Sequence, residues 1–294
     1  MKIAIIGAGE IGTALHHILP KEGNEINLYD KLPGKVPGQK PLADVVAAAD
    51  VLVFAVPSWV LRSAGAEIKP LLSKRTVVAF LSKGLEEGSG KTAFEVLSEE
   101  LSGNSIALIS GPMLGEELMA DRGGAAVVAG SEPEAAEILQ PLLEASGLVV
   151  SLAADIRGVS LAGVLKNVYA IGIGMAHALG WDQSMTGWLF DQAFEEMKLV
   201  IGRLGGKPET ADTAAGLGDL IATGSSDYSN NRQYGIELVG HGSSLIRCEG
   251  GVSLPSLYLL LGSDTGGLPF LEAIRSVVID HASPSDIFSK LKGN

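Results

Sequence analysis

The sequence predicts an α/β domain with a mostly parallel, doubly wound sheet, followed by an all-α domain. Short apolar runs rich in β-branched residues recur through the first half of the chain, with helix-like segments between most of them. From about residue 156 the strand-like runs stop and helical spacing takes over. Alternating strands and helices are typical of a doubly wound sheet. We therefore expect a first domain over residues 1–155 and a helical second domain over residues 156–294.

The composition indicates a globular protein that works on small molecules. Hydrophobic residues make up 46% of the chain and charged residues 19%, which argues against disorder. The formal net charge of -12 argues against general binding to nucleic acids or acidic membranes, because both need a basic face. The single cysteine, Cys248, can form no intrachain disulfide, and the chain starts without a signal-peptide layout. We expect a cytoplasmic protein in which Cys248 is a packed bystander rather than a nucleophile.

A glycine-rich turn joins the first strand-like run, residues 2–6, to a segment with helical spacing. In this order of strand, turn and helix, the first glycine makes a tight turn and the second lets a pyrophosphate approach the backbone. The third glycine lets the helix pack closely on the strand, and the phosphates lie at the positive end of the helix. This pattern predicts a Rossmann-type dinucleotide-binding domain. The predicted contacts in the turn are Gly7, Gly9, Glu10, Ile11 and Gly12.

The second strand-like run, residues 25–30, ends in Asp30. An acid at this place would hold the adenosine ribose hydroxyls and repel a 2′-phosphate, which favours NAD over NADP. The alternative interpretation is that Asp30 only ends a strand. The adjacent Lys31 could tolerate a phosphate. We therefore predict NAD as the cofactor, with NADP as the alternative.

Three further loops follow strand-like runs and would meet at the carboxyl edge of the sheet, where ligands bind in such folds. Pro57 and Trp59 follow the third run, and Trp59 either flanks the cofactor or packs against a helix. Lys83 follows the fourth run, so it either faces the crevice or is one more surface lysine. Residues 110–112, Ser-Gly-Pro, follow the fifth run and are interpreted as a structural turn.

One lysine stands out in the second half of the chain. Lys166 and Asn167 lie in an apolar, glycine-containing helical segment, residues 163–174. Burying an unpaired ammonium costs several kcal/mol or lowers its pKa, so this side chain must reach a partner or a cleft. Asp219, in the glycine-rich run 214–224, either orients such a lysine or only caps a helix. We predict that Lys166 is the centre of the chemistry.

The segment Ser-Asn-Asn-Arg at residues 229–232 opens a predicted helix that runs to about residue 240. Free backbone N–H groups at a helix start, together with the charge of Arg232, would attract an anion. The five histidines and the single cysteine show no spacing typical of a metal site, so we predict none.

Taken in order, these motifs resemble the NAD(P)-dependent glycerol-3-phosphate dehydrogenases along nearly the whole chain. The matching segments are GAGEIGTAL, VPS, KGLE, SGP, GVLKNVYAI, GGKPETADTAAGLGDLIAT, SNNR and the late pair Glu249-Gly250. The resemblance implies an enzyme that interconverts dihydroxyacetone phosphate and sn-glycerol 3-phosphate. Lys166 would be its general acid, a role typically worth about 10²–10⁴-fold in rate, and Asp219 would orient that lysine. The implied substrate contacts are Lys83, Asn167, Thr223, Asn230, Asn231 and Arg232, and the cofactor contacts beyond the turn and Asp30 are Pro57, Lys83, Arg232 and Glu249.

The chain departs from the family pattern at three positions. Asn230 replaces an arginine that usually lies between the serine and the asparagine, and Asp191 replaces a second arginine. Glu10 places an acid in the phosphate loop, where small or neutral residues are usual. A related dehydrogenase of the same fold with a less anionic 2-oxo or 2-hydroxy substrate is therefore one alternative. A non-catalytic dinucleotide sensor is another, although the retained lysine and its neighbours argue against it. We also expect a homodimer.

Overall fold

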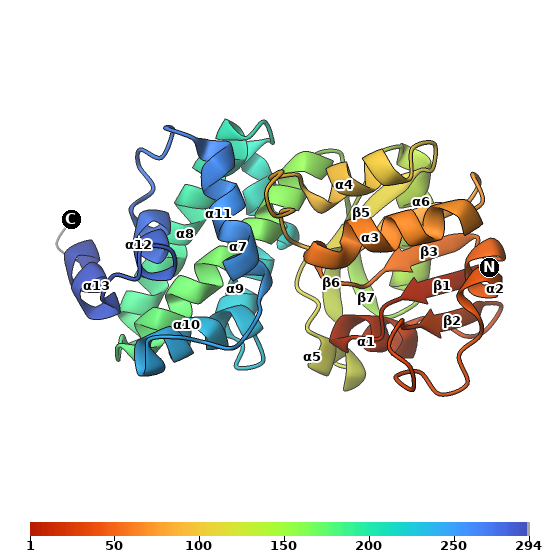
Figure 1. The fold of residues 1–294 in the computed structure, drawn as a ribbon, viewed down its shortest axis with the longest axis horizontal. Helices are drawn as coiled ribbons and strands as arrows, with labels where there is room; N and C mark the ends of the chain where they lie inside the picture. The colour runs from red at the N-terminus through yellow and green to blue at the C-terminus, as the bar shows by residue number, and fades with distance from the viewer. Residues whose placement is uncertain (293–294) are drawn as a thin grey trace.

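The computed structural model describes residues 1–292 as a sheet domain beside a helical domain (Figure 1). The last strand ends at Ala153 and the first helix of the second domain begins at Ile156. The predicted fold class is therefore confirmed. The predicted domain ranges, 1–155 and 156–294, stay predictions, and residues 293–294 lie outside the described part of the chain.

The first domain is built on one seven-stranded sheet with the order β2-β1-β3-β4-β5-β6-β7. Every neighbouring pair is parallel except β5 and β6, which are antiparallel. The central strands β3, β4 and β5 are buried along their whole length, as expected for strands covered on both faces. The strands are β1 (Lys2–Ile6), β2 (Glu25–Tyr29), β3 (Val51–Phe54), β4 (Val77–Phe80), β5 (Ile106–Ser110), β6 (Gly124–Gly130) and β7 (Leu148–Ala153).

Helices cover both faces of this sheet because its strands present apolar side chains to both sides. Ile3 and Ile5 of β1 pack in one apolar cluster with α1 and α6, whereas the alternate residues Ala4 and Ile6 pack in another with α2, α3 and α4. The helices of this domain are α1 (Glu10–Ile18), α2 (Leu42–Ala47), α3 (Ser58–Ile68), the short η1 (Lys69–Leu71), α4 (Ala93–Glu100), α5 (Gly115–Met119) and α6 (Pro133–Glu144).

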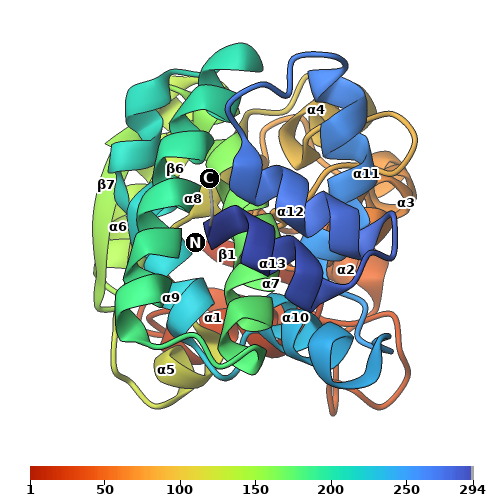
Figure 2. The ribbon, with the colours of Figure 1, turned by 90° about the vertical axis from the view of Figure 1, so that its left-hand side faces the viewer.

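The second domain is organised around α7 (Ile156–Ala178), which is buried from Gly158 to Ala176. Figure 2 looks onto this domain and shows α7 among the other helices, which contact it from several sides. Within residues 1–292, α7 alone is long and apolar enough to cross a membrane, but it is the central helix of this core. The other elements are α8 (Gln183–Arg203), η2 (Pro208–Asp212), η3 (Ala214–Gly218), α9 (Asp219–Ser225), α10 (Asn230–His241), α11 (Glu249–Leu261), α12 (Pro269–Val278) and α13 (Pro284–Lys292).

Glycines let two helices approach α7 closely. A side chain at Gly174 of α7 would overlap the carbonyl oxygen of Arg232, and one at Gly235 of α10 would overlap the carbonyl oxygen of Ile171. The glycine-rich run 214–224 is not a plain α-helix, because residues 214–218 form a π-helical turn before α9 begins at Asp219. Asp219 therefore lies at the junction of this turn and α9.

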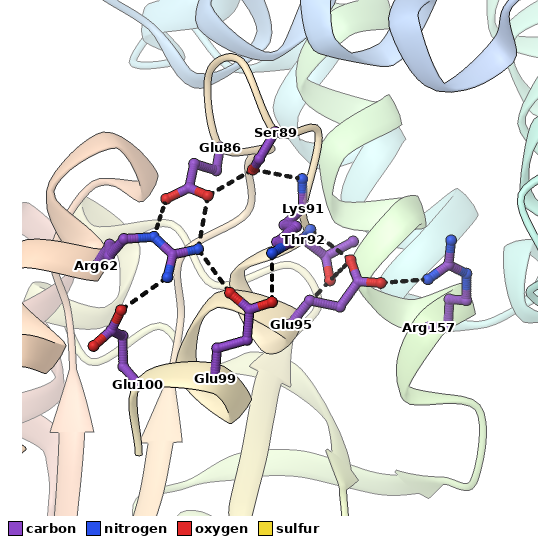
Figure 3. A network of polar contacts seen from close by, with 9 residues as sticks. All are labelled: Arg62, Glu86, Ser89, Lys91, Thr92, Glu95, Glu99, Glu100 and Arg157. Atoms are coloured by element: carbon purple, nitrogen blue, oxygen red, sulfur yellow. Dashed lines mark hydrogen bonds and ion pairs between the residues drawn. The ribbon is translucent and has the colours of Figure 1, made fainter. Parts of the chain in front are cut away.

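The loop between β4 and α4 extends from the sheet domain into the helical domain. Leu85 is fully buried in the helical core, and its N–H donates to Ser253 Oγ at 3.0 Å. The same loop also takes part in the ionic network of Figure 3, in which its Glu86 contacts Arg62 of α3, and Glu95 of α4 contacts Arg157 of α7. These ion pairs are partly open to solvent, and surface pairs are worth about 0–1 kcal/mol each. The buried contacts of the loop therefore contribute more to the position of the nearby Lys83.

Candidate active site

A cavity of about 340 Å³ lies between the two domains at the carboxyl edge of the sheet. The strand order reverses between β1 and β3, and the crevice beside such a reversal is where doubly wound sheets bind ligands. Most of the predicted site residues line this cleft, although they come from segments far apart in the sequence. Those that line it are Gly9, Glu10, Ile11, Pro57, Lys83, Lys166, Asn167, Thr223, Asn230, Asn231 and Glu249.

Two lysines that line the cleft, Lys83 and Lys166, both contact Asp219, which is buried behind them. Lys166 Nζ lies 3.1 Å from Asp219 Oδ1 and donates to Thr223 Oγ1 at 2.8 Å. Lys83 Nζ donates to the other carboxylate oxygen, Asp219 Oδ2, at 2.6 Å and to the carbonyl oxygen of Gly111 at 3.0 Å. Asp219 therefore bridges a lysine from each domain, so the two halves of the site are held in register.

Burial and neighbouring charges set the protonation of this group. Burial lowers the pKa of Lys166 to about 8, Asp219 opposes this shift, and the Lys83 ammonium adds to it. Burial alone would raise the pKa of Asp219, but Lys166 and Lys83 bring that pKa below its ordinary value. The aspartate is therefore charged at neutral pH, and the pKa of the Lys166 ammonium lies close to neutral pH. A proton donor works best with a pKa near the working pH.

A chain of amide contacts holds the rest of the cleft floor. Asn167 Nδ2 donates to the carbonyl oxygen of Lys83 at 2.9 Å, and Asn231 Nδ2 donates to Asn167 Oδ1 at 2.9 Å. The N–H of Gly250 donates to Asn231 Oδ1 at 2.8 Å. A side chain at Gly250 would overlap the carbonyl oxygen of Asn167, which explains a glycine after Glu249. Asn231 thus fixes the side chain of Asn167, and Asn167 in turn links the helical domain to Lys83 of the sheet domain.

The glycine turn has the shape that a dinucleotide pyrophosphate requires. Gly7 has φ 106°, and a Cβ there would lie 2.5 Å from the carbonyl oxygen of Ala55. A side chain at Gly12 would overlap the carbonyl oxygen of Gly7, whereas the space in front of Gly9 is open. No side chain caps the start of α1, so the N–H groups of its first turn are free. The turn therefore fits the diphosphate of a nicotinamide dinucleotide.

Asp30 lies behind this turn and is not among the residues that line the cleft. Its carboxylate accepts the N–H of Ala8 at 2.8 Å and that of Leu32 at 2.9 Å, and Lys35 Nζ lies 3.4 Å away. These hydrogen bonds fix the turn and the loop that follows β2. The interpretation of Asp30 as a ribose contact stays a prediction, and the nearby charge of Lys35 keeps NADP open as the alternative cofactor.

On the opposite wall of the cleft, Glu249 links the two domains, and Arg247 joins the site although the sequence did not indicate it. Glu249 at the start of α11 accepts the N–H of Ser58 at 2.8 Å and also its hydroxyl. Arg247 lines the cleft, and its guanidinium lies 4.5 Å from the ring centroid of Trp59. Trp59 therefore borders the cleft and stacks with an arginine. The only sequence signal for Arg247 was its place two residues before Glu249.

The structure does not bring Arg232 and Asp191 into this cleft. Successive helical residues turn by about 100°, so Asn230 and Asn231 face the cleft while Arg232 points elsewhere. Its guanidinium pairs with Asp227 at 2.7 Å and lines a separate cavity beside α8. Asp191 is exposed on α8. The expectation that Arg232 offers its charge to this site must therefore be corrected, and Arg247 is the arginine of the cleft.

Cys248 lies in the wall of the cleft beside Glu249, and burial raises its pKa to about 11. A thiol with such a pKa is not a nucleophile at neutral pH. Residues 1–292 contain no group of three or more His, Cys, Asp or Glu side chains that could hold a metal ion.

A dinucleotide-binding fold whose interdomain cleft contains a buried lysine paired with an aspartate is the arrangement of an NAD(P)-dependent oxidoreductase. The family model described as "NAD-dependent glycerol-3-phosphate dehydrogenase N-terminus" matches residues 29–136, and the corresponding C-terminus model matches residues 155–289. The chain therefore belongs to the NAD-dependent glycerol-3-phosphate dehydrogenase family.

Individual relatives agree with this assignment. The glycerol-3-phosphate dehydrogenase [NAD(P)+] 2 of Sphingopyxis alaskensis is 34% identical, over 99% of this chain and 96% of that protein. The glycerol-3-phosphate dehydrogenase [NAD(P)+] of Desulfitobacterium hafniense is 36% identical, over 83% of this chain and 75% of that protein. The crystal structure of glycerol-3-phosphate dehydrogenase from Coxiella burnetii superimposes with a TM-score of 0.89 at 26% identity, over 100% of this chain and 99% of that one.

Proposed function

We propose that this protein transfers hydride between NAD(P)H and dihydroxyacetone phosphate to give sn-glycerol 3-phosphate, with Lys166 as the general acid. The observation that carries the proposal is the buried Lys166, held by Asp219 and Thr223 in the cleft that the glycine turn opens into. Membership of the glycerol-3-phosphate dehydrogenase family supports the substrate.

When bound, the nicotinamide supplies the hydride that reduces the ketone carbon. Negative charge then develops on the ketone oxygen, and Lys166 Nζ donates the proton that neutralises it. An ammonium has three N–H donors, of which Thr223 Oγ1 and the Asp219 carboxylate engage two. The third donor is therefore free for the substrate oxygen. In the reverse direction the neutral amine of Lys166 accepts the alcohol proton.

We infer that the substrate phosphate binds at the start of α10. Asn230 and Asn231 begin this helix of 12 residues, and their N–H groups are free, whereas the N–H of Arg232 is capped by Ser229 Oγ. The side chain of Asn231 is already occupied by Asn167 and Gly250, so it contributes its backbone. Arg247, across the cleft, supplies a positive charge that Asn230 cannot.

The alternative, a dehydrogenase of the same fold with a less anionic 2-oxo or 2-hydroxy substrate, is favoured by one observation. Asn230 occupies the cleft wall without a guanidinium, and Arg247 is exposed rather than held in a buried clamp. A non-catalytic sensor has no such support, because Lys166 keeps the contacts with Asp219 and Thr223 that the proposed acid role requires.

A substrate panel tests this choice. Oxidation of NADH, and then of NADPH, is followed by the loss of reduced-nicotinamide absorbance with dihydroxyacetone phosphate, unphosphorylated dihydroxyacetone and a 2-oxo acid. The proposal predicts the highest kcat/KM for dihydroxyacetone phosphate. Faster reduction of an unphosphorylated substrate would replace it with the alternative, and cofactor binding without turnover of any carbonyl would indicate a sensor.

The family assignment implies a small-molecule substrate. A homodimer and a cytoplasmic location are proposals that rest on the sequence. Sedimentation of the purified chain tests the dimer, which predicts a single species of twice the chain mass.

A further inference from the structure

The start of α3 in the sheet domain is joined to the start of α11 in the helical domain. Ser58, the first residue of α3, donates its N–H to Glu249 Oε1 at 2.8 Å and its hydroxyl to Glu249 Oε2 at 2.5 Å. Trp59 follows Ser58, and the guanidinium of Arg247 lies 4.5 Å from the centroid of its ring. We call these four residues the clasp.

Glu249 caps a helix of the other domain. The N-cap residue of α3 is Pro57, which makes no side-chain cap, so the Glu249 carboxylate accepts the N–H that begins this helix. Ser58 is buried, and a side chain at Gly84 would overlap both Glu249 Oε2 and Ser58 Oγ. The loop that carries Lys83 and Gly84 therefore closes directly against this pair. Both oxygens of Glu249 are directed at Ser58.

α11 presents a polar stripe to the sheet domain, and Glu249 is its first member. Ser253 and Ser256 lie four and seven residues further along α11, which places all three on one face of the helix. Ser253 Oγ accepts the N–H of Leu85 at 3.0 Å, and Ser256 Oγ donates to the carbonyl oxygen of Glu86 at 3.1 Å. The loop after β4 is thus attached to α11 by the two serines, whereas α3 is attached to it by the clasp.

The clasp lies between the glycine turn and the lysines of the cleft. Neighbouring strands of the sheet are β1, β3 and β4 in that order. The glycine turn follows β1, Ser58 follows β3 and Lys83 follows β4. A dinucleotide whose pyrophosphate binds at the turn must therefore cross the end of β3 to bring its nicotinamide to Lys83 and Lys166. The start of α3 borders that path.

We propose that Glu249 is a positioning residue for hydride transfer, which holds the start of α3 against the helical domain through Ser58 and so sets the distance between the nicotinamide and the substrate carbonyl. The inference rests on the proposed dehydrogenase function. Glu249 acts by accepting the two hydrogen bonds of Ser58, and its charge is not what the reaction requires. A displacement of about 1 Å between reacting groups can cost about 100-fold in rate, so a contact outside the reacting atoms can limit the reaction.

The experiment measures the single-turnover rate of NADH oxidation by dihydroxyacetone phosphate, with the Kd of NADH and the Tm measured beside it. Glu249→Ala should lower the rate by about 10–100-fold, and Ser58→Ala by about tenfold. The double variant should be no slower than Glu249→Ala, because the two residues act through one contact. Glu249→Gln keeps an acceptor for the N–H and can donate to the hydroxyl, so it should recover most of the lost rate. Ser63→Ala, at an exposed serine of α3, is the matched control and should follow the wild type.

Two further readings separate positioning from general damage. The Kd of NADH should change much less than the rate, because the glycine turn is intact in every variant. The pH midpoint of the rate in Ser58→Ala should equal that of the wild type, because Lys166 keeps its contact with Asp219. A shifted midpoint would contradict the proposal.

The proposal is overturned if Glu249→Gln is as slow as Glu249→Ala, since the charge or a direct cofactor contact would then be what matters. Additive losses in the double variant would overturn it as well. If Glu249→Ala does not fold, Ser58→Ala decides the question, and a wild-type rate in that variant would count against the clasp while leaving the dehydrogenase assignment intact. A wild type that binds NADH but does not turn over dihydroxyacetone phosphate would instead refute the assignment, and this inference with it.

Discussion

Replacing Asp219 with asparagine tests whether this carboxylate keeps Lys166 protonated. Asp219 lies 3.1 Å from Lys166 and 2.6 Å from Lys83, so the variant leaves two ammonium groups facing each other without a counter-charge. A pair of charges 4 Å apart interacts by about 4 kcal/mol at an effective dielectric constant of 20. Even a loss of about 2.7 kcal/mol would lower the pKa of Lys166 by about two units.

The wild-type pKa of Lys166, about 8, makes this change measurable. At pH 7.5 the protonated fraction would fall from about three quarters to about 3%, which predicts a loss of about 25-fold in kcat for ketone reduction. The lost rate should return as the pH is lowered toward 5.5, because the lysine is then protonated again. The assay is kcat against pH with saturating NADH and dihydroxyacetone phosphate.

Two controls separate this effect from general damage. Asp212→Asn removes an exposed aspartate that pairs with Lys198, and it should leave the profile unchanged. Thermal unfolding of Asp219→Asn shows whether the variant is folded. A folded variant whose pH profile keeps the wild-type midpoint would refute the reasoning.

Three other outcomes are expected. Gly9→Ala should weaken NADH binding at least about tenfold, because the methyl group would occupy the open space that the pyrophosphate needs. Its Tm should not change, since no protein atom lies near that methyl group. Gly12→Ala should also lower the Tm, because its side chain would overlap the carbonyl oxygen of Gly7. Arg247→Leu should raise the KM for dihydroxyacetone phosphate by about 10–100-fold, with little change in Tm. Burial raises the pKa of Glu196 to about 7 in the folded protein. The protonated Glu196 carboxyl therefore stabilises the folded state below about pH 4.5, and the free energy of unfolding should fall by up to about 3 kcal/mol as the pH rises to above 7. Urea titrations should show a smaller fall for Glu196→Gln.

The sequence predicted those parts of the site that depend on local patterns. The glycine turn needs only a strand, three glycines and a helix in order, and the structure has them at residues 2–18. Lys166 was visible because an ammonium in an apolar helix must find a partner. Its partner, Asp219, is 53 residues away, so family resemblance was needed to favour an orienting role over a helix cap.

Other features depend on directions that no local pattern encodes. The rotation of α10 decides that Asn231 faces the cleft and Arg232 does not. Arg247 joins the site only because the two domains close against each other and bring Trp59 within reach. The antiparallel pairing of β6 with β5 likewise depends on how the chain returns to the sheet, since a strand-like run looks the same in either direction.

The most direct test of the account compares the wild type with Lys166→Ala in a single turnover of NADH with dihydroxyacetone phosphate, with NADH affinity measured alongside. The account predicts that NADH binds both proteins equally well, whereas the rate of NADH oxidation falls by about 100-fold or more in the variant. A variant that binds NADH and reduces dihydroxyacetone phosphate at the wild-type rate would contradict the assignment of Lys166 as the proton donor.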